Sequence, residues 1–244
     1  MNAYLVFRLY GPLASWGMPA VGGDRPTAAQ PTRSALLGLL AAGLGIKRDK
    51  EYALQALQKS VSFAVKQTVP SSLMRDYHTA QVPTHSNKIT HFTRKSELES
   101  VDLNTILSSR DYRCDGLWIV AVSLTSQATV TLDELQHGLL SPVYSLYLGR
   151  KSCPLAAPLQ PKVIEAKNLK DALDSPFPPL TRSAKEDNLW LGANGWVTYY
   201  WEGEKHEFAG QNVITTHPWD DPVNRSRWQF KQRPMHQFST QESV

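Results

Sequence analysis

The chain has 244 residues, enough for one large core or two small ones, and its hydrophobic fraction of 41% is that of an ordinary globular protein. Its formal net charge of +4 is too small for an overall basic field, so nucleic-acid binding would require local clusters of cations. The two cysteines, Cys114 and Cys153, are too few for a disulfide framework and lack the paired spacing of a zinc site.

The first element is a predicted β-strand. Leu5, Phe7 and Leu9 fall on one side of residues 3–10, which is the alternation of a strand with one buried face. The N-terminus lacks the basic stretch followed by a long apolar run that marks a signal peptide. We therefore expect a cytoplasmic protein.

A loop and a helix follow within residues 11–46. The helix is predicted to begin near Thr32 or Ser34, to carry a leucine-rich face, and to end at Gly45 in a left-handed conformation. Its apolar run, residues 35–46, is too short to span a bilayer, which needs about 20 residues. No membrane contact is expected.

This segment is also poor in acids, and Asp24 is its only carboxylate. The first N–H groups of a helix lack intrahelical partners, and the helix dipole adds positive charge there, so the helix start favours a phosphate. Four cations stand between residues 25 and 48: Arg25, Arg33, Lys47 and Arg48. The sequence therefore predicts a phosphate site formed by Arg25, Thr32, Arg33 and Ser34.

Three later elements complete a repeated pattern. Residues 61–66 alternate as a second strand, residues 117–124 form a third, and residues 131–139 form a capped helix. A last strand or loop is expected near residues 144–154. This order, a strand–helix–strand unit that occurs twice, is typical of a ferredoxin-like fold. The RNA-recognition motif has the same topology.

The predicted fold class is therefore α+β, in two parts. Residues 1–155 would form the ferredoxin-like (RRM-like) domain. Residues 156–244, where the patterns become less regular, would form a smaller, irregular β-rich extension packed on it.

A long polar insertion, residues 70–113, separates the second and third strands. Long loops in compact domains are usually functional or disordered. The tripeptide Arg-Asp-Tyr occurs at residues 75–77 and again at 110–112, which suggests the paired strands of a projecting hairpin, although so short a repeat can arise by chance. Basic and aromatic residues at its base are candidate RNA contacts: Arg75, Tyr77, His78, Arg110 and Tyr112.

A glycine turn with two cations occupies residues 147–154, YLGRKSCP. A glycine lets the backbone approach a phosphate closely, so Gly149, Arg150, Lys151 and Ser152 are a candidate phosphate site. The segment lacks the spacing of a P-loop, and no GxGxxG fingerprint is present. The alternative is a turn that carries charges without a ligand.

The segment 221–236 combines cations with the aromatic residues Trp228 and Phe230. Cations that neutralise phosphates, next to aromatics that stack on bases, are what single-stranded RNA binding requires. A basic strand on a solvated face explains the pattern equally well. The cations are Arg225, Arg227, Lys231 and Arg233.

An RNA-cleaving site is the alternative to simple binding. His78, next to Tyr77 and near Arg75, could deprotonate a 2′-hydroxyl and stabilise the phosphorane. A lone histidine without an acid partner is more often a contact or a structural residue. No HxxxH or HxH pair suggests a metal, so neither metal nor cofactor is expected.

Four separated blocks, in order, closely resemble the CasD family of the type I-E CRISPR surveillance complex known as Cascade. The resemblance covers roughly residues 1–80 and 110–155, and the blocks are GPLASWG, RPTAAQPTRSALLGLLAAGLGI, MRDYHTAQ and YLGRKSCP. The family belongs to the RAMP superfamily of ferredoxin-like RNA binders. The resemblance thus agrees with the predicted fold and interprets the insertion as a thumb.

The resemblance implies a non-catalytic scaffold subunit that binds the 5′ handle of crRNA. Such a subunit would cap the backbone filament, contact the adjacent Cascade backbone subunit and the Cascade large subunit, and meet target DNA only indirectly. Its thumb would displace a base where the handle joins the guide. The implied handle contacts are Arg25, Thr32, Arg33, Ser34, Arg75, Tyr77, His78, Gly149, Arg150, Lys151 and Ser152.

Two alternatives stay open. Related subunits of type I-C systems cleave precursor RNA, so a metal-independent endoribonuclease is the second hypothesis. A generic RNA-recognition module is the third, but it would carry paired aromatics on the central strands, and only Trp118 is suitably placed.

Overall fold

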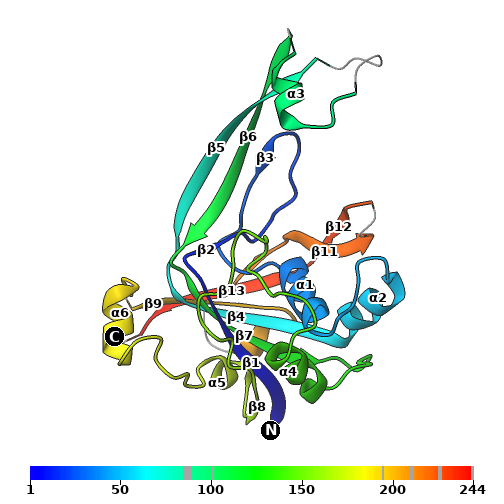
Figure 1. Ribbon diagram of the computed structural model, residues 1–244. Coiled ribbons are helices and arrows are strands. Elements are labelled where there is room, and N and C mark those ends of the chain that lie inside the picture. Colours follow the sequence, from blue (N-terminus) through cyan, green and yellow to red (C-terminus); the bar gives the residue numbers. More distant parts are fainter. Residues whose placement is uncertain (85–89, 101, 194, 209–211, 225–226, 243–244) are drawn as a thin grey trace.

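A computed structural model describes most of the chain (Figure 1). Within it, seven strands form one sheet in the order β10-β13-β9-β4-β7-β1-β8, and a separate group of strands forms a projecting arm. The described residues are 1–84, 90–100, 102–193, 195–208, 212–224 and 227–242.

Four neighbouring strands of the large sheet reproduce the ferredoxin-like order. β1 (Asn2–Tyr10) lies between β7 (Leu117–Leu124) and β8 (Lys162–Ala166), and β4 (Val61–Val69) lies beyond β7. All of these pairs are antiparallel. The prediction of an α+β, ferredoxin-like fold is confirmed. Its fourth strand is β8, however, and residues 144–154 form a loop with a single bridge between Tyr147 and Pro154.

Two helices cover one face of these strands (Figure 1): α1 (Arg33–Gly43) and α4 (Leu132–Leu140). Their leucines join Leu5, Phe7 and Leu9 of β1 in one buried cluster, and burial of each large apolar side chain stabilises the fold by about 1.5–3 kcal/mol. Thr131 and Glu134 cap α4 reciprocally. The two helices approach each other closely at Gly43 and Gly138. A Cβ added to Gly43 would lie 2.7 Å from the carbonyl oxygen of Gly138, so glycine is what permits this approach.

The second face of the sheet is also buried, contrary to the prediction of a strand with one buried face. Tyr4 and Val6 of β1 pack with Tyr199, Trp201 and residues of α5 (Leu169–Leu173) in a second apolar cluster. The residues that cover this face belong to the C-terminal part of the chain. The alternation of apolar residues within β1 does not reveal where that part lies.

The C-terminal segment continues the same sheet. β9 (Trp196–Trp201) pairs with β4, and β13 (Met235–Gln241) pairs with β9. The predicted boundary near residue 155 therefore does not divide the sheet.

The insertion forms the arm, which we call the thumb. β5 (Ser72–Pro83) and β6 (Leu103–Cys114) are paired antiparallel along their whole length, and they project far from the body (Figure 1). The hairpin suggested by the two Arg-Asp-Tyr tripeptides is thus present. Against the other edge of β6 lie β2 (Leu13–Ala14) and β3 (Asp24–Arg25).

The remaining elements are short, and no helix among the described residues is long and apolar enough to cross a membrane. They are α2 (Glu51–Ser60), α3 (Arg94–Leu98), α6 (Ala184–Trp190), the 3-10 helix η1 (Lys205–Phe208), β10 (Ile214–Thr216), β11 (Trp219–Asn224) and β12 (Gln229–Gln232).

Candidate nucleic-acid interface

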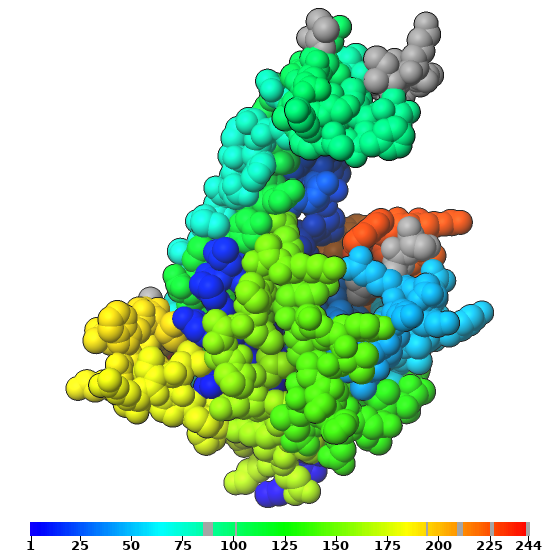
Figure 2. Space-filling model, viewed as in Figure 1, coloured from blue at the N-terminus to red at the C-terminus, as the bar shows by residue number. Residues whose placement is uncertain are grey.

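A groove of about 620 Å³ lies on the body and brings together three segments that are far apart in the sequence. Its residues come from the approach to α1, α1 itself and Arg48 just beyond it, from the glycine turn and the residues before it, and from the β11–β12 hairpin. In the space-filling view the thumb tip overhangs the body, with open space between it and the orange β11–β12 hairpin (Figure 2). The lining residues used below are Arg25, Thr32, Ser34, Arg48, Tyr147, Gly149, Trp219, Trp228 and Phe230.

The start of α1 contributes hydroxyl groups to this groove. Thr32 is the N-cap residue, but its side chain makes no capping hydrogen bond, and its Oγ1 lies 3.3 Å from Oγ of Ser34. Arg25 is exposed, and it donates to the carbonyls of Gly22 at 2.5 Å and Asp24 at 2.8 Å. Three of the four residues predicted at the helix start therefore line one groove.

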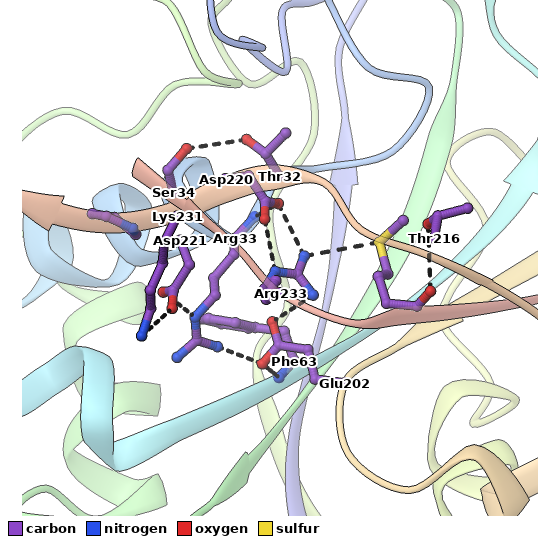
Figure 3. Close-up of polar contacts among 12 residues, drawn as sticks. Thr32, Arg33, Ser34, Phe63, Glu202, Thr216, Asp220, Asp221, Lys231 and Arg233 are labelled. Atoms are coloured by element: carbon purple, nitrogen blue, oxygen red, sulfur yellow. Dashed lines mark hydrogen bonds and ion pairs between the residues drawn. The ribbon is translucent and has the colours of Figure 1, made fainter. Parts of the chain in front are cut away.

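Arg33, the fourth, is absent from the residues that line the groove, and its side chain points toward Glu202 and Asp221 instead (Figure 3). Only 8% of the residue is exposed, and its guanidinium donates to Asp221 at 3.0 Å, to Glu202, and to the carbonyl of Gln58 at 2.7 Å. Its backbone N–H donates to Asp220 at 2.8 Å. The prediction that Arg33 contacts phosphate is corrected: its guanidinium is ion-paired with carboxylates of the chain itself, and its N–H already donates to another carboxylate.

Arg33 belongs to a wider set of paired charges, buried or half-buried except for the exposed Lys231, which we call the charge cluster: Arg33, Glu202, Asp220, Asp221, Lys231 and Arg233. Arg233 donates to Asp220 at 2.7 Å and 2.9 Å, and Lys231 lies 3.4 Å from Asp221. Two cations of the basic C-terminal segment are therefore neutralised within the fold. Arg225 of that segment lies outside the described residues.

The glycine turn packs tightly against the body. Gly149 has a φ of +84°, and a Cβ at this position would stand 1.8 Å from the carbonyl oxygen of Ser15. The Ser15 N–H donates to the carbonyl of Leu148 at 3.0 Å, which holds the turn beside β2. Glycine is required here both by the backbone conformation and by the close approach.

Arg150 connects the three predicted contact regions. Its guanidinium donates to the carbonyl of Arg25 at 3.2 Å and lies 5.2 Å from the ring centre of Tyr112 at the thumb base. Among the described residues its Nη1 is buried without a hydrogen-bond partner. Lys151 and Ser152 are exposed beside it, outside the groove lining.

The thumb base divides its predicted contacts between two faces. Side chains alternate along β5, so Arg75 and Tyr77 point to one face and His78 to the other. Arg75 donates to Asp111 at 2.8 Å and 3.0 Å, and these hydrogen bonds lower the pKa of the Asp111 carboxyl below its usual value. None of the three lines the groove.

His78 has an acid partner that the sequence analysis did not identify. Its Nδ1 lies 3.2 Å from Oδ2 of Asp76, on the same face of β5, and both residues are part of the exposed hairpin. Arg110 stands opposite Asp76 in the strand register and is exposed. Among the described residues no group of three or more His, Cys, Asp or Glu side chains could hold a metal ion.

Arg48, Trp219, Trp228 and Phe230 line the groove but were not predicted as contacts. Trp228 and Phe230 belong to the basic, aromatic segment that was noted, so the signal was present but equally compatible with a solvated strand. No sequence pattern around Trp219 pointed to an RNA contact. Arg48 was one of the four cations, without a partner that would single it out.

Comparisons with known proteins agree with this architecture. The family described as "CRISPR-associated protein (Cas_Cas5)" matches residues 4–236. The CRISPR system Cascade subunit CasD of Escherichia coli (strain K12) is 42% identical over 181 residues, which cover 71% of this chain and 76% of that protein.

Two solved structures share the fold. A chain of a "CRISPR RNA-guided surveillance complex" aligns with a TM-score of 0.63 at 23% identity, over 99% of this chain and 90% of that one. A "Crystal structure of Cas protein" aligns with a TM-score of 0.60 at 23% identity, over 98% of this chain and 93% of that one. The family match over most of the sequence and the identity to CasD show that this protein belongs to the Cas5 family of CRISPR-associated proteins.

Proposed function

We propose that this chain is the CasD-type subunit of a type I-E Cascade complex and that it binds the 5′ handle of crRNA without cleaving it. The observation that carries the proposal is the groove of about 620 Å³, in which the predicted helix start and glycine turn meet. The 42% identity to a Cascade subunit supports membership of such a complex.

The chemistry of the groove suits single-stranded RNA. Arg25 and Arg48 supply positive charge at its surface, Thr32 and Ser34 supply hydroxyl groups, and the β11–β12 hairpin supplies aromatic rings. Cations hold phosphates, while exposed rings stack on unpaired bases. Arg150 and Tyr112 connect this groove to the thumb base, so RNA leaving the groove can follow the thumb.

The thumb supports the proposed partners. Several apolar side chains are more than a third exposed along β5 and β6: Leu73, Met74, Tyr77, Ile106 and Leu107. By the strand register, Leu73, Tyr77 and Leu107 fall on one face of the hairpin and Met74 and Ile106 on the other. Exposed apolar side chains of this kind suit packing against a neighbouring backbone subunit. Contact with the large subunit, indirect contact with target DNA and a cytoplasmic location stay predictions from the resemblance.

Replacing Arg25 and Arg150 together with alanine is expected to weaken handle binding at least about tenfold, because charge-assisted contacts to phosphates are lost. The salt dependence should also become shallower, by about 0.7 per phosphate contact on a log–log plot. Binding of end-labelled crRNA is measured across a salt series. Arg182→Ala with Lys185→Ala is the matched control: it removes the same charge from exposed positions outside the groove lining.

The same assay decides between binding and cleavage. The pair His78–Asp76 favours the second candidate, a metal-independent endoribonuclease, since it supplies a base with an acid partner. Tyr77, on the opposite face of β5, does not support it. Retention of intact repeat RNA would support the scaffold function. A single cut, made without metal and abolished in His78→Ala, would replace it with the nuclease.

A further inference from the structure

Aromatic side chains gather on the wall of the groove formed by the β11–β12 hairpin. Trp219 is 53% exposed and Trp228 is 67% exposed, and both line the groove together with Phe230. Single exposed apolar residues are common on protein surfaces, but three large rings converging in one hollow mark a binding surface.

A cation accompanies the most exposed ring. The guanidinium of Arg48 lies 6.0 Å from the ring centre of Trp228, and Arg48 makes no ion pair with any described residue. It comes from the segment between α1 and α2, so two distant parts of the chain meet at this point. A ring beside an unneutralised guanidinium can stack on a base while the guanidinium binds the adjoining phosphate.

The hairpin that carries the rings is held in place by the charge cluster. Asp220 and Asp221 follow Trp219 directly on β11, and they bind Arg33 at the start of α1 and Arg233 after β12. Trp228 itself has a φ of 53°, which is rare for a bulky side chain and has to be imposed by its surroundings. The rings are therefore presented in a prearranged position, which lowers the entropic cost of binding.

We infer that Trp219, Trp228, Phe230 and Arg48 form a stacking subsite for one unpaired base of the bound RNA, with its phosphate on Arg48. The inference rests on the proposed function, because it assumes that RNA occupies the groove. An unpaired nucleotide fits better than an apolar protein segment, because the wall combines exposed rings with an unneutralised cation and continues into the Arg25 side of the groove.

The test compares handle RNAs that lack one base at successive positions. Trp228→Ala is expected to weaken binding about 5- to 150-fold, the range for loss of one base–aromatic stack. Trp228→Phe should retain most of the affinity. Removing the base at one position should weaken RNA binding by the wild type by the same factor, and it should not weaken binding by Trp228→Ala any further. RNA binding should also quench tryptophan fluorescence less in Trp228→Ala than in the wild type.

The control is Trp190→Ala, which removes a 74%-exposed tryptophan from α6, outside the groove lining, and should leave affinity unchanged. Unchanged RNA affinity in Trp228→Ala, while the Arg25 and Arg150 variant still loses binding, would refute the subsite and leave the proposed function standing. Loss of complex assembly without loss of RNA affinity would assign the rings to a protein partner instead. Absence of handle binding by the wild type would overturn both.

Discussion

Arg33→Ala is expected to lower the free energy of unfolding by about 3–5 kcal/mol, the usual cost of removing one partner from a buried ion pair. Without the guanidinium, Asp221 and Glu202, whose side chains are only 12% and 13% exposed, lose their shorter ion pairs. Among the described residues they keep only the ion pairs with Lys231 and Arg233, at 3.4 Å. Two carbonyl acceptors, on Gln58 and Val61, also lose their donor. Chemical denaturation monitored by circular dichroism measures the change.

Two substitutions make the Arg33 result interpretable. Arg33→Lys retains the charge but cannot serve Asp221, Glu202 and two carbonyls at once, so an intermediate loss is expected. Arg94→Ala breaks an exposed ion pair with Glu97 and should change stability by less than about 1 kcal/mol. If Arg33→Ala kept wild-type stability and lost only RNA affinity, Arg33 would be a phosphate contact after all.

Gly149→Ala is expected to destabilise the chain by more than about 2 kcal/mol and to weaken RNA binding. The left-handed conformation alone costs an alanine about 1–2 kcal/mol. The new Cβ would also stand 1.8 Å from the Ser15 carbonyl oxygen, a backbone atom, so the turn or β2 has to move. That movement displaces Arg150 from Arg25 and Tyr112. Thermal unfolding and crRNA affinity are the two readouts.

Gly192→Ala separates the cost of the left-handed backbone conformation from the cost of the Cβ clash. Gly192 has a φ of +66°, but its Cβ would meet nothing within 4 Å. This variant should therefore show the conformational cost without the clash, and its RNA affinity should equal that of the wild type. Equal destabilisation by both variants would mean that the close approach at Gly149 contributes nothing.

The local elements follow from local patterns. The leucines of residues 36–44 and Gly45 determine where α1 lies and where it ends, and Gly45 indeed has a φ of +74°. The paired Arg-Asp-Tyr tripeptides lie in the thumb hairpin, where Arg75 stands opposite Asp111 in the register. Periodicity and turn residues carry this information because they act over a few residues.

The environment of each charge could not be predicted in this way. The residues around Arg33 contain no acid, which suggested a free cation, yet its carboxylate partners lie 187 and 188 residues further along the chain. Arg233 and Lys231 pair with the same two aspartates across the β11–β12 hairpin, only 13 and 10 residues away. For this reason the phosphate site inferred at the helix start retains Arg25, Thr32 and Ser34 but not Arg33.

The sequence by itself determined the ferredoxin-like order of elements except its fourth strand, the strands of the thumb hairpin, and two of the three segments that line the groove, because each is encoded by patterns within a short stretch of residues. Only the tertiary structure decided which cations face solvent and which face of β1 the C-terminal strands cover. It also decided that Trp219, Trp228 and Phe230 line the same groove as Arg48. These outcomes depend on contacts between distant segments, whose geometry is set when the whole core packs.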